Sequence, residues 1–298
     1  MTPGWISLTT DYGLSDGFVA VVHGVILRHD PDLRIIDVTH EVHPGDIARG
    51  AIVLAEAVPF LPSGVHIAVV DPGVGTQRRG IAIRTAGGLL VGPDNGVLWP
   101  AAEALGGADA AVELDNPAWH RARVSATFHG RDIFAPVAAR LATGQPFGDA
   151  GTAIDLETLV RLPEPQARIA TGELEAEVRM VDRFGNVQLH LDGDALSMVD
   201  DEVSVLGQAA RRVRTFGDAP RGSLVVLTDS SGKVAIAING GRAVVALGVV
   251  PGDSVRITNR VAPSAEDRTV SAETVGRTAT GAEATGSDAA DHKAPTDA

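Results

Sequence analysis

Short apolar runs alternate with helix-like stretches through roughly the first half of the chain, and this alternation restricts the fold more than any other feature of the sequence. The runs at residues 5–10, 33–38 and 65–70 are predicted strands, and residues 81–84 and 89–91 are predicted to form a hairpin. Residues 18–28, 46–58 and 132–142 are predicted helices, the last one bent or started late because of Pro136. Continuously apolar strands separated by helices are typical of a mostly parallel sheet covered on both faces. We therefore expect an α/β N-terminal domain at residues 1–162.

The second half of the chain has a different character. A proline-bracketed segment at residues 161–165 marks the change, and residues 163–168 are a predicted linker. Short strand candidates with turn signals follow at residues 175–181, 186–191, 202–205, 224–228, 234–238 and 254–258. This spacing predicts a smaller all-β domain, a barrel or a sandwich, at residues 169–258. Residues 259–298 are acidic and rich in Ala and Thr, with too few large aliphatic side chains to offset chain entropy, so they are a predicted disordered tail.

Composition and charge exclude several classes of function. The chain has 25 Lys and Arg against 38 Asp and Glu, a formal net charge of −13, which argues against binding nucleic acid or anionic membranes because both are negatively charged. Cysteine is absent, so there is no disulfide framework, thiolate metal site or cysteine nucleophile. No apolar run approaches the ~18 residues of a membrane span, and the first residues lack the features of a signal peptide. We therefore expect a soluble cytoplasmic protein.

Four polar turns carry the side chains that could support chemistry. Asp11 and Asp16 follow the first predicted strand, and Asp71 follows the third, ahead of Arg78. The other two turns are Gly-Pro-Asp-Asn-Gly at residues 92–96 and Phe-His-Gly-Arg-Asp at residues 128–132, which contains His129. In parallel α/β sheets, ligands bind in the crevice beyond the carboxyl ends of the strands. The sequence therefore predicts a polar site where these turns converge.

Each turn also has a purely structural interpretation. An aspartate at a strand end is commonly a helix cap or part of an Asx-turn, and a single histidine is more often hydrogen-bonded structure than a catalyst. The glycine-rich stretch at residues 73–78 has Arg78 where a dinucleotide-binding motif needs a third glycine, and the P-loop and serine-hydrolase motifs are absent from the sequence. His40, His43 and Asp46 offer metal ligands, but Pro44 favours a loop there and no H-E-x-x-H motif is present, so we expect no metal site.

Three polar strand tips in the second domain form a further candidate surface. They are Asp-Arg-Phe-Gly-Asn at residues 182–186, Thr-Asp-Ser-Ser-Gly at residues 228–232 and Ile-Asn-Gly-Gly at residues 238–241. If one face of this domain closes over a crevice, these tips are its contacts. The alternative is that each is only a β-turn.

Taken together, these segments resemble the S-adenosylmethionine (SAM) hydroxide adenosyltransferase family, which is related to adenosyl fluorinases and chlorinases. The motifs are Thr-Thr-Asp-Tyr-Gly at 9–13, His-Pro-Gly-Asp at 43–46, Val-Asp-Pro-Gly-Val-Gly-Thr at 70–76, and the turns at 92–96, 128–132 and 182–186. They occur in the family's order, and the resemblance spans residues 5 to about 258. It implies an α/β domain, a β-rich domain and a homotrimer whose ligand lies between the first domain of one subunit and the second domain of its neighbour.

The resemblance also implies roles for individual residues. Asp11 binds the ribose hydroxyls, Asp16 and Asp182 face the methionine ammonium, and Ser230 faces its carboxylate. Asn186 binds the adenine edge, with the backbone around Asn239 and Gly240. The family's hydrolytic members are similar in carrying an Asp–Arg–His set, which falls on Asp71, Arg78 and His129.

The expected reaction is attack of an activated water on ribose C5′, which gives adenosine and L-methionine without a cofactor. Either Asp71 or His129 can be the base. A chlorinase-type halogenase is the alternative within enzymes, but Asp71 lies where a halide pocket has an aromatic, and a carboxylate there repels an anion. Gly130 replaces the serine of fluorinase pockets, and the long fluorinase insertion is missing. A binding protein with negligible turnover and, more remotely, a metal-dependent hydrolase also remain.

Overall fold

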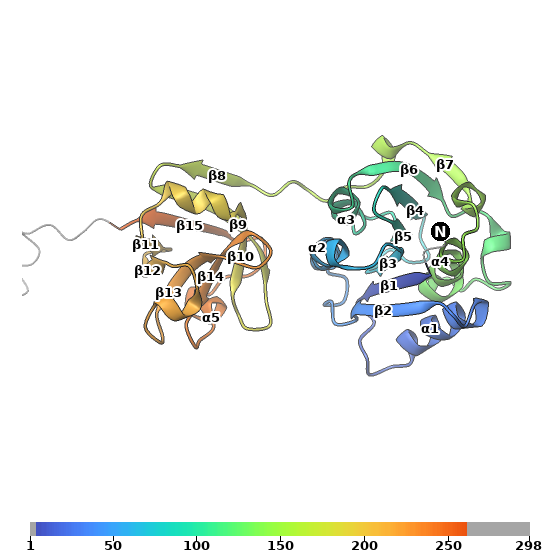
Figure 1. Ribbon diagram of the computed structural model, residues 1–298, viewed down its shortest axis with the longest axis horizontal. Coiled ribbons are helices and arrows are strands. Elements are labelled where there is room, and N and C mark those ends of the chain that lie inside the picture. The colour runs from blue at the N-terminus through green and yellow to red at the C-terminus, as the bar shows by residue number, and fades with distance from the viewer. Residues whose placement is uncertain (1–3, 261–298) are drawn as a thin grey trace, which may run out of the picture.

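A seven-stranded mixed sheet forms the centre of the N-terminal domain in the computed structural model, which describes residues 4–260 (Figure 1). Its strands lie in the order β2 (Arg34–Thr39), β1 (Trp5–Thr10), β3 (Val65–Val69), β5 (Leu89–Pro93), β4 (Gly80–Thr85), β6 (Ala108–Glu113) and β7 (Thr152–Ile154). The first four strands are parallel, and β4, β6 and β7 continue the sheet with antiparallel pairings. Because β1, β3 and β5 are parallel, their carboxyl ends lie at one edge of the sheet.

Helices cover both faces of this sheet, as the apolar strands require. One layer contains α1 (Phe18–His29) and α4 (Ala135–Ala142), and the other contains α2 (Ile47–Ala57) and α3 (Trp99–Ala104). In α1 the buried positions Val19, Val22 and Ile26 follow helical spacing, which directs one stripe into the core. Asp46 caps α2 by accepting a hydrogen bond from the Arg49 amide at 2.9 Å. Short helical segments of three to six residues occupy Val58–Phe60, Pro117–Trp119, Gly130–Phe134, Phe147–Ala150, Leu156–Thr158, Gly193–Met198 and Phe216–Asp218.

The C-terminal domain is a closed barrel, which resolves the choice between barrel and sandwich. Its strands are β8 (Ala167–Ala170), β9 (Glu173–Val181), β10 (Val187–Asp192), β11 (Glu202–Val205), β12 (Gln208–Arg212), β13 (Leu224–Thr228), β14 (Lys233–Ile238) and β15 (Ser254–Asn259). Seven of them form a ring in the order β10–β14–β13–β12–β11–β15–β9, and the antiparallel pairing of β9 with β10 closes it. Strand β8 adds to the outside edge of β9, and α5 (Ala243–Leu247) follows β14. Closure gives hydrogen-bond partners to the backbone N–H and C=O groups of strands that would otherwise lie at the edges of the sheet.

The predicted fold class, an α/β domain followed by a smaller β domain, is confirmed, but the sheet is mixed rather than mostly parallel. Three of its pairings are parallel and three are antiparallel, because β4, β6 and β7 extend it with antiparallel neighbours. The predicted strands and helices of the first domain correspond to β1 to β5 and to α1, α2 and α4, but α3, β6 and β7 were not predicted. These three elements are short and rich in alanine, so they lack the branched or periodic apolar pattern that marks β1 or α1. Two predicted boundaries shift: β8 begins at Ala167, inside the predicted linker, and Asn259, the first residue of the predicted tail, is the last residue of β15. The predicted tail from residue 261 onward lies outside the described residues.

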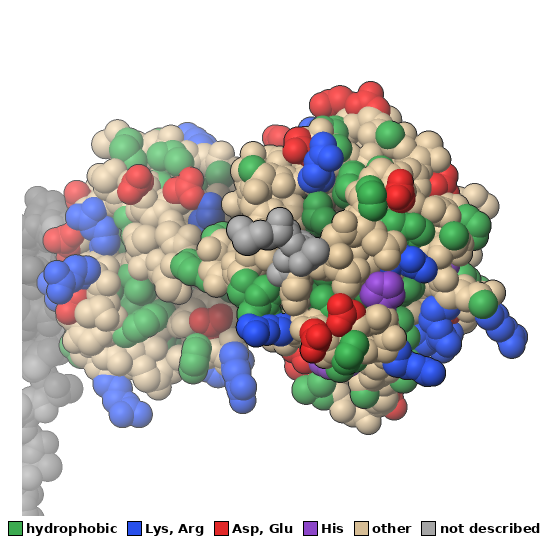
Figure 2. Space-filling view, turned by 45° about the vertical axis from the view of Figure 1, so that its right-hand side comes forward, with side chains coloured by type: hydrophobic (Ala, Val, Ile, Leu, Met, Phe, Trp, Pro, Cys, Tyr) green, Lys and Arg blue, Asp and Glu red, His purple; other side chains and the backbone are tan. Residues whose placement is uncertain are grey.

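Polar contacts connect the two domains, and an extended segment between β7 and β8 joins them in sequence (Figure 1). The guanidinium of Arg179 on β9 forms an ion pair with Glu56 on α2 and also donates to Gln188 on β10. Arg49, near the start of α2, contacts Met180. Lys and Arg side chains are interspersed with acidic ones on the face shown in Figure 2. None of the helices within residues 4–260 is long and apolar enough to cross a membrane.

Candidate functional site

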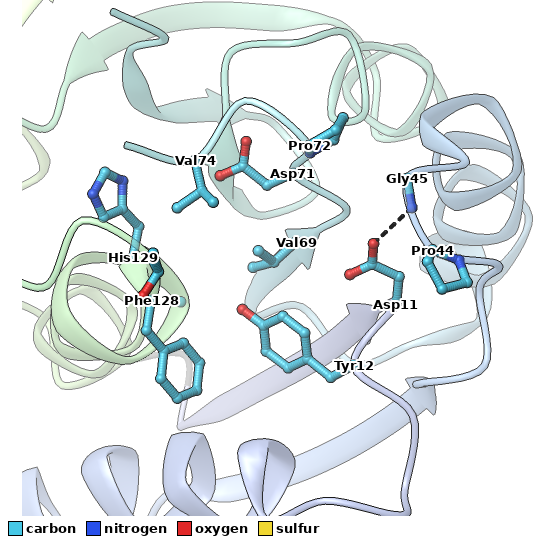
Figure 3. Close-up of a pocket in the computed structure, with 12 residues that line it drawn as sticks. Asp11, Tyr12, Pro44, Gly45, Val69, Asp71, Pro72, Val74, Phe128 and His129 are labelled. Atoms are coloured by element: carbon cyan, nitrogen blue, oxygen red, sulfur yellow. Dashed lines mark hydrogen bonds between the residues drawn. The ribbon is translucent and has the colours of Figure 1, made fainter. Parts of the chain in front are cut away.

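The turns that follow β1 and β3 meet the Phe128–Gly130 turn around a cavity of about 380 Å³ (Figure 3). Asp11 comes directly after β1, Asp71 lies two residues beyond β3, and His129 precedes the helical turn that begins at Gly130. The cavity is lined by Asp11, Tyr12, Pro44, Gly45, Val69, Asp71, Pro72, Val74, Thr127, Phe128, His129 and Gly130. We call this the sheet-edge cavity. It lies where the parallel topology predicts a ligand site.

Asp71, Arg78 and His129 form a connected cluster at this cavity. The Arg78 guanidinium binds both carboxylate oxygens of Asp71, with Nε to Oδ1 at 3.1 Å. Its Nη2 also lies 3.1 Å from His129 Nδ1. The side chains of Asp71 and Arg78 are only 4% and 8% exposed, so water screens this pair weakly. The structure therefore brings together the three residues that the sequence grouped as a catalytic set.

The contact with Arg78 determines how His129 can act. A guanidinium only donates hydrogen bonds, so Nδ1 of His129 must accept, and the proton of the neutral ring is on Nε2. Burial, followed by the Arg78 charge, lowers the pKa of His129, and Asp71 opposes this shift only in part. His129 is thus neutral at pH 7 and offers an N–H donor from Nε2.

Tyr12 is a residue of this cavity that the sequence analysis did not single out. Its hydroxyl lies so close to Gly130 that a Cβ built there would be 2.1 Å from the oxygen. Its ring packs edge-on against Phe128, with the ring centroids 5.7 Å apart. Burial and then the nearby carboxylates of Asp11 and Asp71 raise the pKa of Tyr12, so the hydroxyl keeps its proton. Its position next to Asp11, just after the first predicted strand, was the available signal.

Within residues 4–260, the side chain of Asp11 has one hydrogen bond. Its Oδ2 accepts a hydrogen bond from the Gly45 amide at 2.9 Å, as Figure 3 shows, and Oδ1 remains for a ligand. Asp16 lies apart from Asp11, exposed in the turn before α1, and is not among the residues that line the sheet-edge cavity. Of the two aspartates in that turn, only Asp11 lines the sheet-edge cavity.

The residues predicted in the second domain line a different cavity, of about 880 Å³, on the barrel. Asp182, Asn186, Ser230 and Gly240 line it, together with Phe184 and Asp229 of the same predicted tips. Gln188 of β10 and Glu56 of α2 also line it and were not predicted. We call this the barrel cavity. Asp182 is occupied in shaping its own turn, because it accepts from the amides of Phe184 and Asn186 at 2.8 and 2.9 Å and from Asn186 Nδ2 at 2.7 Å.

Asn239 does not line either cavity. Its side-chain amide donates to the Ala219 carbonyl at 2.8 Å, which fixes the loop beside Gly240. Gln188, Asp229 and the Arg179–Glu56 pair form a polar chain along the barrel cavity. The sheet-edge cavity and the barrel cavity share no lining residue. The predicted binding set is therefore divided between two surfaces of one chain.

The metal grouping considered from the sequence does not form. Asp46 caps α2 through its bond to Arg49, and His43 is exposed. His40 instead points toward β1, where its Nδ1 lies 2.8 Å from the Thr10 hydroxyl.

Comparisons with known proteins agree on one family. Residues 6–151 match the SAM hydroxide adenosyltransferase N-terminal domain, and residues 176–256 match the C-terminal domain of the same family. An (R)-S-adenosyl-L-methionine hydrolase of Salinispora arenicola is 60% identical over 85% of this chain and 97% of its own length. A hydrolase of that name from Thermus thermophilus is 41% identical over 83% of this chain and 97% of its own length.

More distant similarities extend to a halogenating enzyme and to solved structures. A fluorinase of Actinopolyspora mzabensis is 28% identical over 85% of this chain and 96% of its own length. The crystal structure of an uncharacterized conserved protein from Thermotoga maritima is 38% identical, with a TM-score of 0.79 over 85% of this chain and 99% of that one.

Proposed function

Because this chain belongs to the SAM hydroxide adenosyltransferase family, we propose that it hydrolyses S-adenosyl-L-methionine to adenosine and L-methionine. The observation that carries the proposal is the Asp71–Arg78–His129 cluster, from which the carboxylate of Asp71 and the partly buried, neutral imidazole of His129 line the sheet-edge cavity. A carboxylate in this position holds water and repels halide, so the site favours hydroxide transfer over halogenation.

The reaction needs activation of the nucleophile rather than of the leaving group. Water oxygen forms a bond to ribose C5′, and the C5′–S bond breaks with its electron pair moving to sulfur. The sulfonium already carries a positive charge, so methionine leaves as a neutral thioether without a proton from a general acid. The proton lost by water must pass to a base in the cavity.

The geometry favours Asp71 as that base and His129 as the group that orients the water. Nδ1 of His129 is engaged by Arg78, and Nε2 carries the proton, so the neutral ring donates to the water oxygen. Asp71 accepts the proton, and Arg78 fixes the directions of both groups. Positive sulfonium and incoming hydroxide neutralise each other, which a site with little water promotes.

Variants distinguish the two roles. Loss of a general base typically costs ~10²–10⁴-fold in rate, so we expect Asp71→Asn to lower kcat by that factor. His129→Gln keeps an N–H donor and is expected to lose less. A larger loss for His129→Gln than for Asp71→Asn would reverse the assignment.

We further propose that the complete site forms between subunits of a homotrimer. Asp11 binds the two ribose hydroxyls, since one carboxylate can accept from both, and the barrel cavity of a neighbouring chain supplies Asn186 for adenine and Asp182 and Ser230 for the methionine end. The support is that Asp11 lines one cavity whereas Asp182, Asn186, Ser230 and Gly240 line the other, and the two cavities share no lining residue. The exposed Asp16 faces the methionine ammonium in this arrangement.

Complementation tests the shared site. Asp71→Asn damages the sheet-edge cavity and Asn186→Ala the barrel cavity, and the two variants are unfolded and refolded together in equal amounts. Random mixing pairs two intact surfaces at about one interface in four, so activity should return to about a quarter of the wild-type rate. A mixture of Asp71→Asn with His129→Gln, both in the same cavity, serves as the control and should gain nothing. Equal results for the two mixtures would contradict a shared site.

The activity itself is tested with purified protein and SAM in halide-free buffer, with the products separated by chromatography. We expect adenosine and methionine in equal amounts, and the Asp71→Asn variant serves as the blank. If product appears only after chloride is added, as 5′-chloro-5′-deoxyadenosine, the chain is a halogenase. Binding of SAM without either product would show a binding protein.

A further inference from the structure

Two histidines and an aspartate meet behind the Asp11 turn, outside the cavities described above. His23 lies on α1, Asp37 on β2 and His40 just after β2. His23 Nε2 is 2.9 Å from Asp37 Oδ1, and His40 Nε2 is 3.0 Å from the same oxygen. One ligand atom from each residue lies within 4.8 Å of the others. Helix α1, strand β2 and the residue that follows β2 thus each place one potential ligand atom close to the other two.

The buried member of the cluster is not satisfied by hydrogen bonds. His40 is 4% exposed, and its Nε2 has no hydrogen-bond partner within the described part of the chain, because its approach to Asp37 lacks hydrogen-bond geometry. A buried polar atom without a partner costs about 1–3 kcal/mol and calls for an explanation such as a water or an ion. This nitrogen lies at the point where His23 and Asp37 also converge.

The surroundings of His40 match those of a metal ligand. Its other ring nitrogen, Nδ1, lies 2.8 Å from the Thr10 hydroxyl, which leaves Nε2 as the coordinating atom. His23 and Asp37 have side chains that are 28% and 40% exposed, so an ion can arrive from solvent and keep a water ligand. Two imidazoles, a carboxylate and a water form a ligand set that suits Zn²⁺.

We propose that His23, Asp37 and His40 form a binding site for Zn²⁺ that is separate from the reaction centre. Ligand atoms at ~2.0–2.1 Å from a tetrahedral zinc lie about 3.3 Å apart, so the two histidine–aspartate separations of 2.9 and 3.0 Å need to open by only a few tenths of an ångström. The two imidazole nitrogens lie within 4.8 Å of each other and have to come to the same spacing. The formal charge of −13 also favours uptake of cations.

This ion would stabilise the loop that carries Asp11. The His40 carbonyl accepts a hydrogen bond from the Gly13 amide at 2.8 Å, and its ring contacts Thr10, so His40 holds the chain on both sides of Asp11 and Tyr12. Thr10 also accepts from the Tyr12 amide at 3.2 Å. The inferred role is therefore structural, and the ion takes no part in the chemical step.

Zinc titration of the full chain tests the proposal without relying on activity. The protein is stripped with chelator, dialysed into chelator-free buffer at pH 7.5 and titrated with ZnCl₂ by calorimetry. We expect one equivalent to bind and Tm to rise with zinc concentration. His23→Ala and Asp37→Asn, both at partly exposed positions that should fold, are expected to weaken binding at least tenfold.

His43→Ala is the matched control, because His43 is exposed and only three residues from His40 yet lies outside the cluster. It should bind zinc as wild type does. Absence of a one-equivalent transition in the wild type would overturn the proposal, as would unchanged affinity in both His23→Ala and Asp37→Asn. The three side chains would then be a hydrogen-bonded group only.

Discussion

The close approach of Tyr12 to Gly130 predicts that Gly130→Ala lowers the stability of the protein, although alanine usually stabilises a helix relative to glycine. Gly130→Ala places a Cβ 2.1 Å from the Tyr12 hydroxyl, whereas ordinary contacts lie near 3.5–4.0 Å, so the tyrosine must retreat by more than an ångström. Overpacking of this kind typically costs about 1–3 kcal/mol. Replacing a helical glycine by alanine gains up to about 1 kcal/mol, so we expect a net loss of about 1–2 kcal/mol.

A double-mutant cycle isolates the cause of that loss. Tyr12→Phe removes the hydroxyl, and the next atom, Cζ, lies 3.2 Å from the new Cβ, a distance that a small movement relieves. In the Tyr12→Phe background, Gly130→Ala should therefore be close to neutral, with a coupling energy of about 1–2 kcal/mol. Thermal unfolding measures this, since 1 kcal/mol corresponds to roughly 2–4 °C in Tm for a chain of this size.

Gly24→Ala supplies the control, because Gly24 lies within α1 and a Cβ added there would meet nothing within 4 Å. It should be neutral or stabilising. The reasoning fails if Gly130→Ala is as stable as wild type, or if it loses the same stability in both backgrounds. Initial rates of SAM hydrolysis provide a second readout, since Gly130→Ala also displaces the side chain of Tyr12, which lines the sheet-edge cavity.

Three further predictions concern pH and binding. Burial and Arg78 lower the pKa of His129, so its ring stays neutral as the pH falls to about 6.5, the ordinary pKa of histidine. We therefore expect kcat/KM to decline only below that pH. A decline that begins above neutral pH would contradict this. Burial lowers the pKa of His66 to about 4, so between pH 6.5 and 4 the unfolded chain takes up a proton that the folded chain does not. The free energy of unfolding should therefore fall by up to about 3 kcal/mol over this pH range. Urea titrations of His66→Gln should show a smaller fall. Asp11→Ala should raise KM for SAM far more than it lowers kcat in steady-state assays, and the opposite split would mean that Asp11 acts in the chemical step.

Local sequence patterns were sufficient for much of the fold. The β-branched run of β3 and the stripe of Val19, Val22 and Ile26 in α1 each specify one element from neighbouring residues alone. For the second domain the sequence left two architectures open, a barrel and a sandwich. The difference depends on the pairing of β9 with β10 and on the order of strands that are distant in sequence. Short elements such as α3 were missed because tertiary packing, not local preference, holds them in place.

The candidate site was predictable to the extent that strand direction determines it. Asp11 and Asp71 follow parallel strands, so their meeting follows from topology. That Asp16 is exposed and lies outside the cavity lining depends on the path of a turn, which composition does not specify. The contact of Tyr12 with Gly130 joins residues far apart in sequence, and no local signal marks it. The roles of the predicted site residues stay predictions until the variants are measured.

The division of the binding residues between two cavities of one chain also bears on how a cell experiences this protein. Under the proposed assembly, a newly made chain carries both surfaces, but its Asp71–Arg78–His129 cluster is completed only by the barrel cavity of a neighbouring subunit. Consumption of SAM would then increase more steeply than protein concentration until trimers predominate. Low expression would spare the cell's methyl donor, and a modest rise in expression would drain it, so that the level of synthesis acts as a threshold without any dedicated regulator.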